Sequence, residues 1–209
     1  DVVVHSNFIY VAGKTSSYGA GSSDTVLLKY NYTGELLWNR TYGTDDEEVA
    51  RGVEVDSEGD IYVTGWSSST SLDVLLLKYN ESGEILWSTT FDDSSNDEVA
   101  YSVKTDTSDN VYVSGKRADD VLLLKTDTNG TLLWNLTAGD TGLDAAYDMY
   151  VNGSYVYLTG ESDSDLWLLK YDTSGLEIFN KTTGASGTDV GYDIILDNGG
   201  NIYVVGQTS

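Results

Sequence analysis

The chain lacks cysteine and proline altogether, and it carries little positive charge. Without cysteine, neither a disulfide framework nor a thiolate metal site is available. Without proline, the turns must be built from glycine, asparagine, aspartate and serine. Apolar runs of about 18 residues are also absent, so the sequence predicts no membrane-spanning helix.

The charge is strongly unbalanced, with 34 acidic residues against 11 basic ones and a formal net charge of -23. Nucleic-acid phosphates and anionic lipids are recognised by clusters of lysine and arginine, which this sequence lacks. We therefore expect no nucleic-acid partner. His5 is the single histidine, so Ser-His-Asp catalysis and histidine-ligated zinc chemistry lack their parts.

The sequence does contain a segment that recurs five times, a tyrosine followed three residues later by a glycine. The tyrosines are Tyr10, Tyr62, Tyr112, Tyr157 and Tyr203, which gives a period of 45–52 residues. Within each period, four short segments are rich in β-branched, leucine and tyrosine residues and alternate apolar with polar positions, as half-buried strands do. Helical periodicity does not extend over 11 residues anywhere.

Repeats of four antiparallel strands with apolar faces predict an all-β fold, a β-propeller built of four-stranded blades. The repeats cover approximately residues 1–48, 49–98, 99–144 and 145–189, with a partial copy at 190–209, and together they form one repeat domain. Four complete repeats plus an extra pair of strands do not make a whole number of blades. We therefore expect this to be part of a larger propeller, or a propeller completed by another subunit.

A longer pattern covers essentially the whole chain, and it is clearest in segments 57–87 and 197–208. It reads Asp-x-x-Gly-Asn-Ile-Tyr-Val-x-Gly, then Asp-x-x-Leu-x-Lys-Tyr-Asp-x-x-Gly, then Leu-x-Trp. This pattern resembles the SBBP-type β-propeller repeat of secreted and surface-anchored bacterial and archaeal proteins. The resemblance implies a non-catalytic extracellular module at a cell surface. Such a module would act as a structural or adhesion scaffold, with a protein or glycan partner or by self-association.

The alternative hypothesis is a carbohydrate-active propeller enzyme, a hydrolase or lyase that uses carboxylates or tyrosines in the axial funnel. Tyr101, Tyr147 and Tyr192 recur in the expected first strand, near the axis. Core packing explains their periodic placement better than catalysis does. We therefore assign no catalytic residue from the sequence, and no cofactor other than calcium is considered.

Acidic residues gather in the segments expected to join one repeat to the next. Hard cations such as calcium prefer carboxylate and carbonyl oxygens as ligands. A basic partner surface and a merely solvated acidic face are the alternatives. The calcium candidates are Asp45, Asp46, Glu47, Glu48, Asp92 and Asp93.

Asn-x-Ser/Thr sequons are also frequent, and proline interrupts none of them. Three directly follow the aromatic residue of the expected fourth strand, and three lie in the turn that precedes this strand. If the protein is exported by an organism with the required machinery, we expect glycans at some of them. The seven sequons are at Asn31, Asn39, Asn80, Asn129, Asn135, Asn152 and Asn180.

Overall fold

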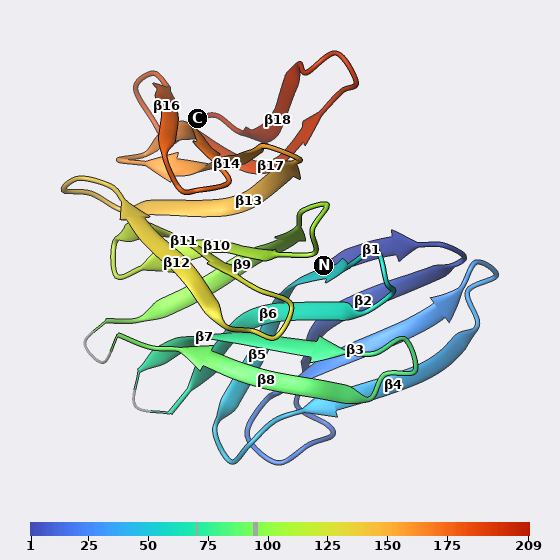
Figure 1. Ribbon diagram of the computed structural model, residues 1–209. Helices are drawn as coiled ribbons and strands as arrows, with labels where there is room; N and C mark the ends of the chain where they lie inside the picture. The colour runs from blue at the N-terminus through green and yellow to red at the C-terminus, as the bar shows by residue number, and fades with distance from the viewer. Residues whose placement is uncertain (70, 94–95) are drawn as a thin grey trace. The chain divides into compact units, whose positions relative to one another are not determined.

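The computed structural model describes residues 1–69, 71–93 and 96–209, and these residues form β-strands, turns and loops without a helix (Figure 1). They divide into two compact units, Asp1–Thr105 and Asp106–Ser209. The first unit contains β1 (Val2–His5), β2 (Phe8–Thr15), β3 (Asp24–Asn31), β4 (Leu36–Tyr42), β5 (Glu47–Val55), β6 (Ile61–Ser68), β7 (Leu72–Tyr79), β8 (Ile85–Phe91) and β9 (Glu98–Thr105). The second contains β10 (Val111–Arg117), β11 (Asp120–Thr126), β12 (Leu132–Ala138), β13 (Asp144–Asn152), β14 (Tyr155–Ser162), β15 (Asp165–Asp172), β16 (Glu177–Thr183), β17 (Val190–Leu196) and β18 (Ile202–Gln207). The predicted all-β class is confirmed, and no helix among the described residues is available to cross a membrane.

Within each sheet the strands lie side by side in the order in which the chain forms them. The first unit has two four-stranded antiparallel sheets, β1-β2-β3-β4 and β5-β6-β7-β8, and β9 lies against the second of them. In the second unit, β13-β14-β15-β16 form a third such sheet, β11 pairs with β10 and β12, and β17 pairs with β18. Up-and-down sheets of this kind are what the repeat pattern predicted.

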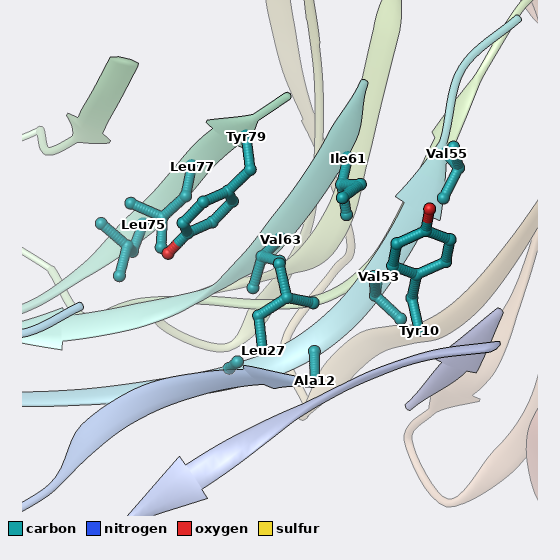
Figure 2. Packing of buried hydrophobic residues seen from close by; sticks show 11 residues of the cluster. Tyr10, Ala12, Leu27, Val53, Val55, Ile61, Val63, Leu75, Leu77 and Tyr79 are labelled. Atoms are coloured by element: carbon teal, nitrogen blue, oxygen red, sulfur yellow. The ribbon is translucent and has the colours of Figure 1, made fainter. Parts of the chain in front are cut away.

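The core of the first unit lies where its two sheets face each other (Figure 2). Tyr10 and Leu27 of the first sheet are 1% exposed, and they meet apolar side chains from β5, β6 and β7. One sheet is too thin to bury its own faces, so the apolar stripe of one copy is buried by the next. The buried cluster comprises Tyr10, Ala12, Leu27, Ala50, Val53, Val55, Ile61, Val63, Leu75, Leu77 and Tyr79.

The second unit repeats this arrangement with different residues. Side chains from β10 and β11 pack against side chains from β13, β14 and β15. Met149 and Trp167 take part, which shows that the repeats preserve apolar character rather than residue identity. The cluster comprises Tyr112, Val121, Leu123, Ala146, Met149, Val156, Leu158, Trp167, Leu169 and Tyr171.

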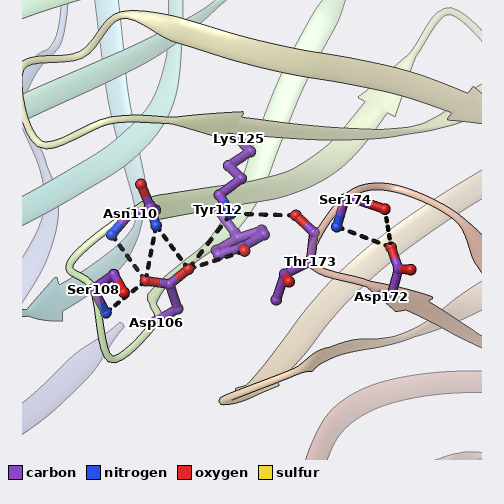
Figure 3. A network of polar contacts seen from close by, with 8 residues as sticks. All are labelled: Asp106, Ser108, Asn110, Tyr112, Lys125, Asp172, Thr173 and Ser174. Atoms are coloured by element: carbon purple, nitrogen blue, oxygen red, sulfur yellow. Dashed lines mark hydrogen bonds and ion pairs between the residues drawn. The ribbon is translucent and has the colours of Figure 1, made fainter.

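A polar network ties the recurring tyrosine to the turn that precedes its strand (Figure 3). Asp106 accepts hydrogen bonds from the backbone N–H groups of Ser108 (2.9 Å) and Asn110 (3.1 Å) and from the Tyr112 hydroxyl (3.1 Å). Lys125 Nζ lies 3.5 Å from the Asp106 carboxylate. Burial would raise the pKa of Asp106, but the hydrogen bonds from Asn110 and Ser108 outweigh it and lower this pKa below its usual value.

The second repeat has the same turn and lysine contacts, without the hydrogen bond from the tyrosine hydroxyl to the aspartate. Asp56 accepts hydrogen bonds from the N–H groups of Glu58 and Asp60, and Lys78 Nζ lies 3.8 Å from Asp56 and 2.8 Å from Asp60. Burial is the main reason that the pKa of Tyr62 rises to about 12. The lysine of the apolar third strand is therefore held by acids of the first turn, which keeps its charge neutralised where it is buried.

The tryptophan of the fourth strand packs as expected for a structural residue. The rings of Trp38, Trp87 and Trp134 lie 6.0–6.2 Å from the recurring tyrosine rings of their own sheets. Trp38 and Trp134 also border the two buried clusters. These tryptophans therefore join the outer strand of each sheet to its core.

A β-bulge interrupts the pairing of the first and second strands at the same place in three sheets. The extra residues on the first strand are Arg51, Tyr147 and Tyr192. Opposite each bulge lies the glycine of the tyrosine segment, and a Cβ added to Gly65, Gly160 or Gly206 would stand 1.8–1.9 Å from a backbone carbonyl oxygen of the bulged strand. The recurring glycine is thus needed because the bulge brings the two backbones together.

We expect Gly160→Ala to destabilise the protein by about 2–3 kcal/mol, since the new Cβ meets the Ala145 carbonyl oxygen and the backbone must shift. Chemical denaturation measures this change. Gly13→Ala is the matched control, because Gly13 occupies the same place in the first repeat with no atom within 4 Å of the added Cβ. Its effect should stay within about 1 kcal/mol. Equal losses from the two substitutions would contradict this account of the glycine.

Candidate active site

Two of the bulged residues, Tyr147 and Tyr192, form a cluster of polar groups in the second unit. The Tyr147 hydroxyl donates a hydrogen bond to Glu161 Oε1, and the Tyr192 hydroxyl donates one to Gln207 Oε1 at 3.1 Å. The two rings lie 6.0 Å apart, tilted by 45°. We call Tyr147, Glu161, Tyr192 and Gln207 the tyrosine cluster.

The backbone of adjacent strands fixes the tyrosine cluster in place. The bulges turn both tyrosines out of the regular alternation of their strands, as bulges beside active sites commonly do. The Ile194 N–H donates to Asp148 Oδ2 at 3.1 Å, which ties β17 to β13 next to the two tyrosines. Gly191 leaves space for Thr159, whose hydroxyl would lie 2.1 Å from an added Cβ.

The sequence favoured core packing for these tyrosines, and the structure corrects that interpretation. Tyr147 is half-buried and Tyr192 is 51% exposed, so neither belongs to the buried core. Tyr101 is also only half-buried. A bulge changes which side of a strand a residue faces, and the alternation of apolar and polar residues does not reveal it.

The tyrosine cluster combines groups that acid–base chemistry requires. Glu161 offers a carboxylate held by a phenol hydroxyl, and Tyr192 offers a second hydroxyl on the neighbouring strand. A carboxylate can take a proton from an attacking water, and a hydroxyl can donate to an oxygen that gains negative charge. Such a set suits the hydrolysis of an ester or lactone.

Aspartates crowd the loops that follow Glu161 in the chain. Repulsion from Asp140, followed by reduced hydration and smaller contributions from Asp144 and Asp165, raises the pKa of the exposed Asp163 above its usual value. Asp144 is fully buried, and its Oδ2 accepts a hydrogen bond from the Asp140 N–H at 3.0 Å. The surroundings of Asp163 are therefore strongly negative.

Carboxylates also meet at the corners between repeats. The residue after the fourth strand is Gly43, Gly139 or Gly184 in three repeats, and a Cβ there would lie within 2.5 Å of an aspartate oxygen from the start of the third strand. In the second repeat this residue is Asp92 instead. Carboxylate oxygens of Asp73, Asp92 and Glu98 lie within 4.8 Å of one another, which makes them the residues best placed to hold a hard cation.

The other calcium candidates lie apart from this group of three or are engaged elsewhere. Glu47 and Glu48 are successive residues of β5, so their side chains point to opposite faces. Glu47 lies 3.8 Å from Lys14 Nζ, whereas Glu48 is buried and accepts hydrogen bonds from Thr44 and Ser67.

The aspartates among the remaining candidates are at the surface or in a loop. Asp45 and Asp46 are exposed, and Asp93 accepts a hydrogen bond from Asn96 at 3.2 Å. Calcium binding therefore stays a prediction that concerns Asp92 most directly.

The sequons differ in exposure. Asn31 and Asn80 are half-buried, and their amides are engaged in turns, donating to Glu35 (3.0 Å) and Glu84 (2.8 Å). Asn180 accepts a hydrogen bond from the Trp167 ring N–H at 2.6 Å. Glycosylation itself remains a prediction, and the exposed candidates are Asn39, Asn129, Asn135, Asn152 and Asn180.

We expect Asp163→Asn to raise the thermal unfolding midpoint at pH 7. The folded state raises the pKa of Asp163, so its charged form costs stability above that pKa, and the gain should disappear near pH ~3, where the aspartate is protonated. Asparagine also suits the left-handed backbone at this position, where Asp163 has a φ of 50°. Melting curves across this pH range measure the effect.

Asp197→Asn provides the comparison of opposite sign. Hydrogen bonds from Asn201 lower the pKa of Asp197, so its carboxylate stabilises the fold at neutral pH and that stability is lost as the pH falls through the lowered pKa. The substitution should therefore lower the midpoint at pH 7. A lowered midpoint for Asp163→Asn would contradict the repulsion described above.

Calcium should raise the thermal midpoint of the wild-type protein at low salt after treatment with a chelator, because an ion bound only by the folded state stabilises it. Asp92→Gly should abolish this increase, since it restores the glycine found at this corner in the other repeats. Asp93→Asn is the control and should leave the increase intact. An equal increase for the wild type and for Asp92→Gly would show that Asp92 does not take part in calcium binding.

The fold is shared with solved structures at low sequence identity. A periplasmic gluconolactonase, PpgL, from Pseudomonas aeruginosa matches with a TM-score of 0.66 at 13% identity, covering 96% of this chain and 62% of that one. A candidate 6-phosphogluconolactonase from Bacteroides uniformis matches with a TM-score of 0.63 at 12% identity, covering 99% and 62%. A protein of unknown function from Bacteroides caccae matches with a TM-score of 0.57 at 14% identity, covering 87% and 66%. The chain thus spans less than two thirds of the length of each.

No protein-family profile and no curated protein sequence matches the chain. At 12–14% identity the structural matches establish an all-β, β-propeller-like fold. The prediction of a non-catalytic adhesion scaffold is corrected by this comparison, because one of the similar structures is a gluconolactonase and another is a candidate 6-phosphogluconolactonase. The alternative from the sequence, a carbohydrate-active propeller enzyme of the hydrolase class, fits the comparison better.

Proposed function

We propose that this chain forms part of a propeller hydrolase that opens the ring of sugar lactones. The observation that carries the proposal is the Tyr147–Glu161 hydrogen bond beside Tyr192, at a bulge of a β-propeller-like fold. The likeness to a gluconolactonase and to a candidate 6-phosphogluconolactonase supports the reaction class. The site residues themselves come from this chain alone.

In the proposed reaction, the Glu161 carboxylate removes a proton from a water molecule, whose oxygen forms a bond to the lactone carbonyl carbon. Tyr147 orients the carboxylate through its hydroxyl. The Tyr192 hydroxyl turns its one hydrogen from Gln207 Oε1 to the carbonyl oxygen as this oxygen becomes negative. The bond between this carbon and the ring oxygen then breaks. The ring oxygen takes the proton back from Glu161, and the product is the open hydroxy acid.

The charge of the protein favours an uncharged substrate. The acids around Asp163 already repel one another strongly enough to raise a pKa, and the chain as a whole has a net charge of -23. A phosphorylated lactone would meet this field with two further negative charges. Gluconolactone carries none, so we propose that neutral sugar lactones are preferred.

We further propose that the repeats are blades of a closed ring, of the SBBP repeat type that the sequence resembles, and that the protein works outside the cytoplasm. One of the similar structures is a periplasmic protein, which supports an exported location. Exposed sequons are compatible with that environment. A sugar lactone is the partner of the site under this proposal.

Hydrolysis of glucono-δ-lactone should exceed the spontaneous rate in a pH-stat assay, and Glu161→Gln should lower kcat/KM by at least about 100-fold through loss of the general base. Glu35→Gln is the control, because it removes the same charge from a surface turn of the first unit. Phosphorylated gluconolactone should give a lower kcat/KM than the neutral lactone. Full activity of the Glu161→Gln protein would show that the tyrosine cluster is not the active site.

A further inference from the structure

The last pair of strands differs from the sheets that precede it. In the complete sheets, the second strand pairs on both edges: β2 with β1 and β3, β6 with β5 and β7, and β14 with β13 and β15. β18 is the corresponding strand of the last copy, and within the described residues it pairs only with β17. Its outer edge therefore presents backbone N–H and C=O groups that the ladder does not use.

Apolar side chains are exposed along this hairpin, and those of β18 occupy positions that are buried in the complete sheets. Tyr203 is 54% exposed, whereas Tyr62 and Tyr112, at the same place in their repeats, are 0% exposed. Val205 and Ile195 are 64% and 57% exposed. A soluble protein seldom leaves such residues together on an open strand edge without a partner.

Asp197 at this edge indicates which side chain a binding partner would supply. Asp56 and Asp106 each lie within 3.8 Å of the third-strand lysine of their own sheet. Asp197 occupies their place in the last copy, and it accepts hydrogen bonds from Asn201 and from the Tyr203 hydroxyl at 3.1 Å, just as Asp106 does from Asn110 and Tyr112. The described residues supply no lysine to it, so an acid and a tyrosine are arranged for a cation that would come with a third strand.

We propose that the outer edge of β18 binds a β-strand of the repeat's own third-strand type, which places a lysine against Tyr203 and Asp197. The register follows from the complete sheets, where the tyrosine pairs with the lysine: Tyr62 with Lys78, Tyr112 with Lys125 and Tyr157 with Lys170. An apolar residue then lies opposite Val204, as Leu77 lies opposite Val63. Binding is by strand addition, in which the backbone provides affinity and the side chains provide specificity.

The strand donor is a segment outside these 209 residues. All four third strands of this chain are already paired on both edges: β3 with β2 and β4, β7 with β6 and β8, β11 with β10 and β12, and β15 with β14 and β16. A second folded copy therefore has no third strand to give. This inference depends on the fold and does not depend on the proposed lactonase activity.

A labelled peptide with the sequence of residues 120–138, the third and fourth strands of the third repeat, tests the proposal by fluorescence anisotropy. We expect saturable binding to the 209-residue protein. A peptide with Lys125→Glu should bind at least about tenfold more weakly, because it meets Asp197 with like charge. With the Asp197→Asn protein, this difference between the two peptides should shrink toward unity.

A fused variant keeps the test decisive if the free peptide aggregates. Residues 119–138 are appended directly after Ser209, so that Ser209 and Asp119 form a two-residue turn like Ala118–Asp119 between β10 and β11, and Lys125 follows Tyr203 at the same spacing as it follows Tyr112. The fused protein should unfold at a higher temperature than the 209-residue protein, and hydrogen exchange in β18 should slow at least about tenfold. The fusion carrying Lys125→Glu in the appended segment should gain less.

Several results would overturn the proposal. The first is equal binding of the lysine and glutamate peptides to the wild-type protein. The second is a fusion that changes neither the unfolding temperature nor the exchange of β18. The third is a concentration-dependent dimer that protects β18 by itself, which would show that a second copy covers this edge.

Discussion

Each sheet of this protein has two apolar faces and needs a neighbour on both. Leu75, Leu76 and Leu77 of β7 are successive residues whose side chains point alternately to opposite faces, and all three are at most 2% exposed. A strand buried on both sides reads as a continuous apolar run, and such a run is stable only between other layers. Repetition of the sheet therefore follows from its chemistry, because one copy alone would expose hundreds of square ångströms of apolar surface.

Burial on both faces leaves little space for charged groups inside the stack, and the repeat deals with its one internal lysine in a consistent way. Asp106 and Tyr112 hold Lys125 at the end of the strand, where the turn backbone also satisfies the aspartate. In the first and fourth repeats no such aspartate is present, and the lysine lies closer to an aromatic ring, 3.9 Å from the Phe8 centroid for Lys29 and 3.7 Å from the Tyr155 centroid for Lys170. Lys29 also forms an ion pair with Glu81 at 3.2 Å. Both arrangements keep the lysine, buried or half-buried, close to negative charge density.

Much of the fold could be predicted from the sequence because its signals are local and repeated. The strands, their order and the packing of the tryptophans all follow from alternation and from fixed offsets within one period. The tyrosine cluster could not be predicted in the same way. Whether Tyr147 faces the core or the solvent depends on one extra residue in β13, and the alternation pattern carries no sign of it.

The role of Asp92 shows a second limit. The sequence places it among many acids, and only the three-dimensional structure reveals that it lies close to Asp73 and Glu98, at a corner where other repeats have glycine. The clue was present in the sequence as a break in an otherwise regular position. Departures from the repeat were therefore more informative about chemistry than the repeat itself, which mostly reports packing.

At the bulge, one side chain can vary without any change in the pairing of the strands around it. Arg51, Tyr147 and Tyr192 stand at the same point of their strands, and the glycine opposite accommodates the backbone whatever the bulged residue is. Substitution there changes the chemistry presented by a blade while the ladder on either side is preserved. A tandem array built in this way can acquire new reactive groups one blade at a time, because a substitution at the bulged position leaves the strand pairing of that blade intact.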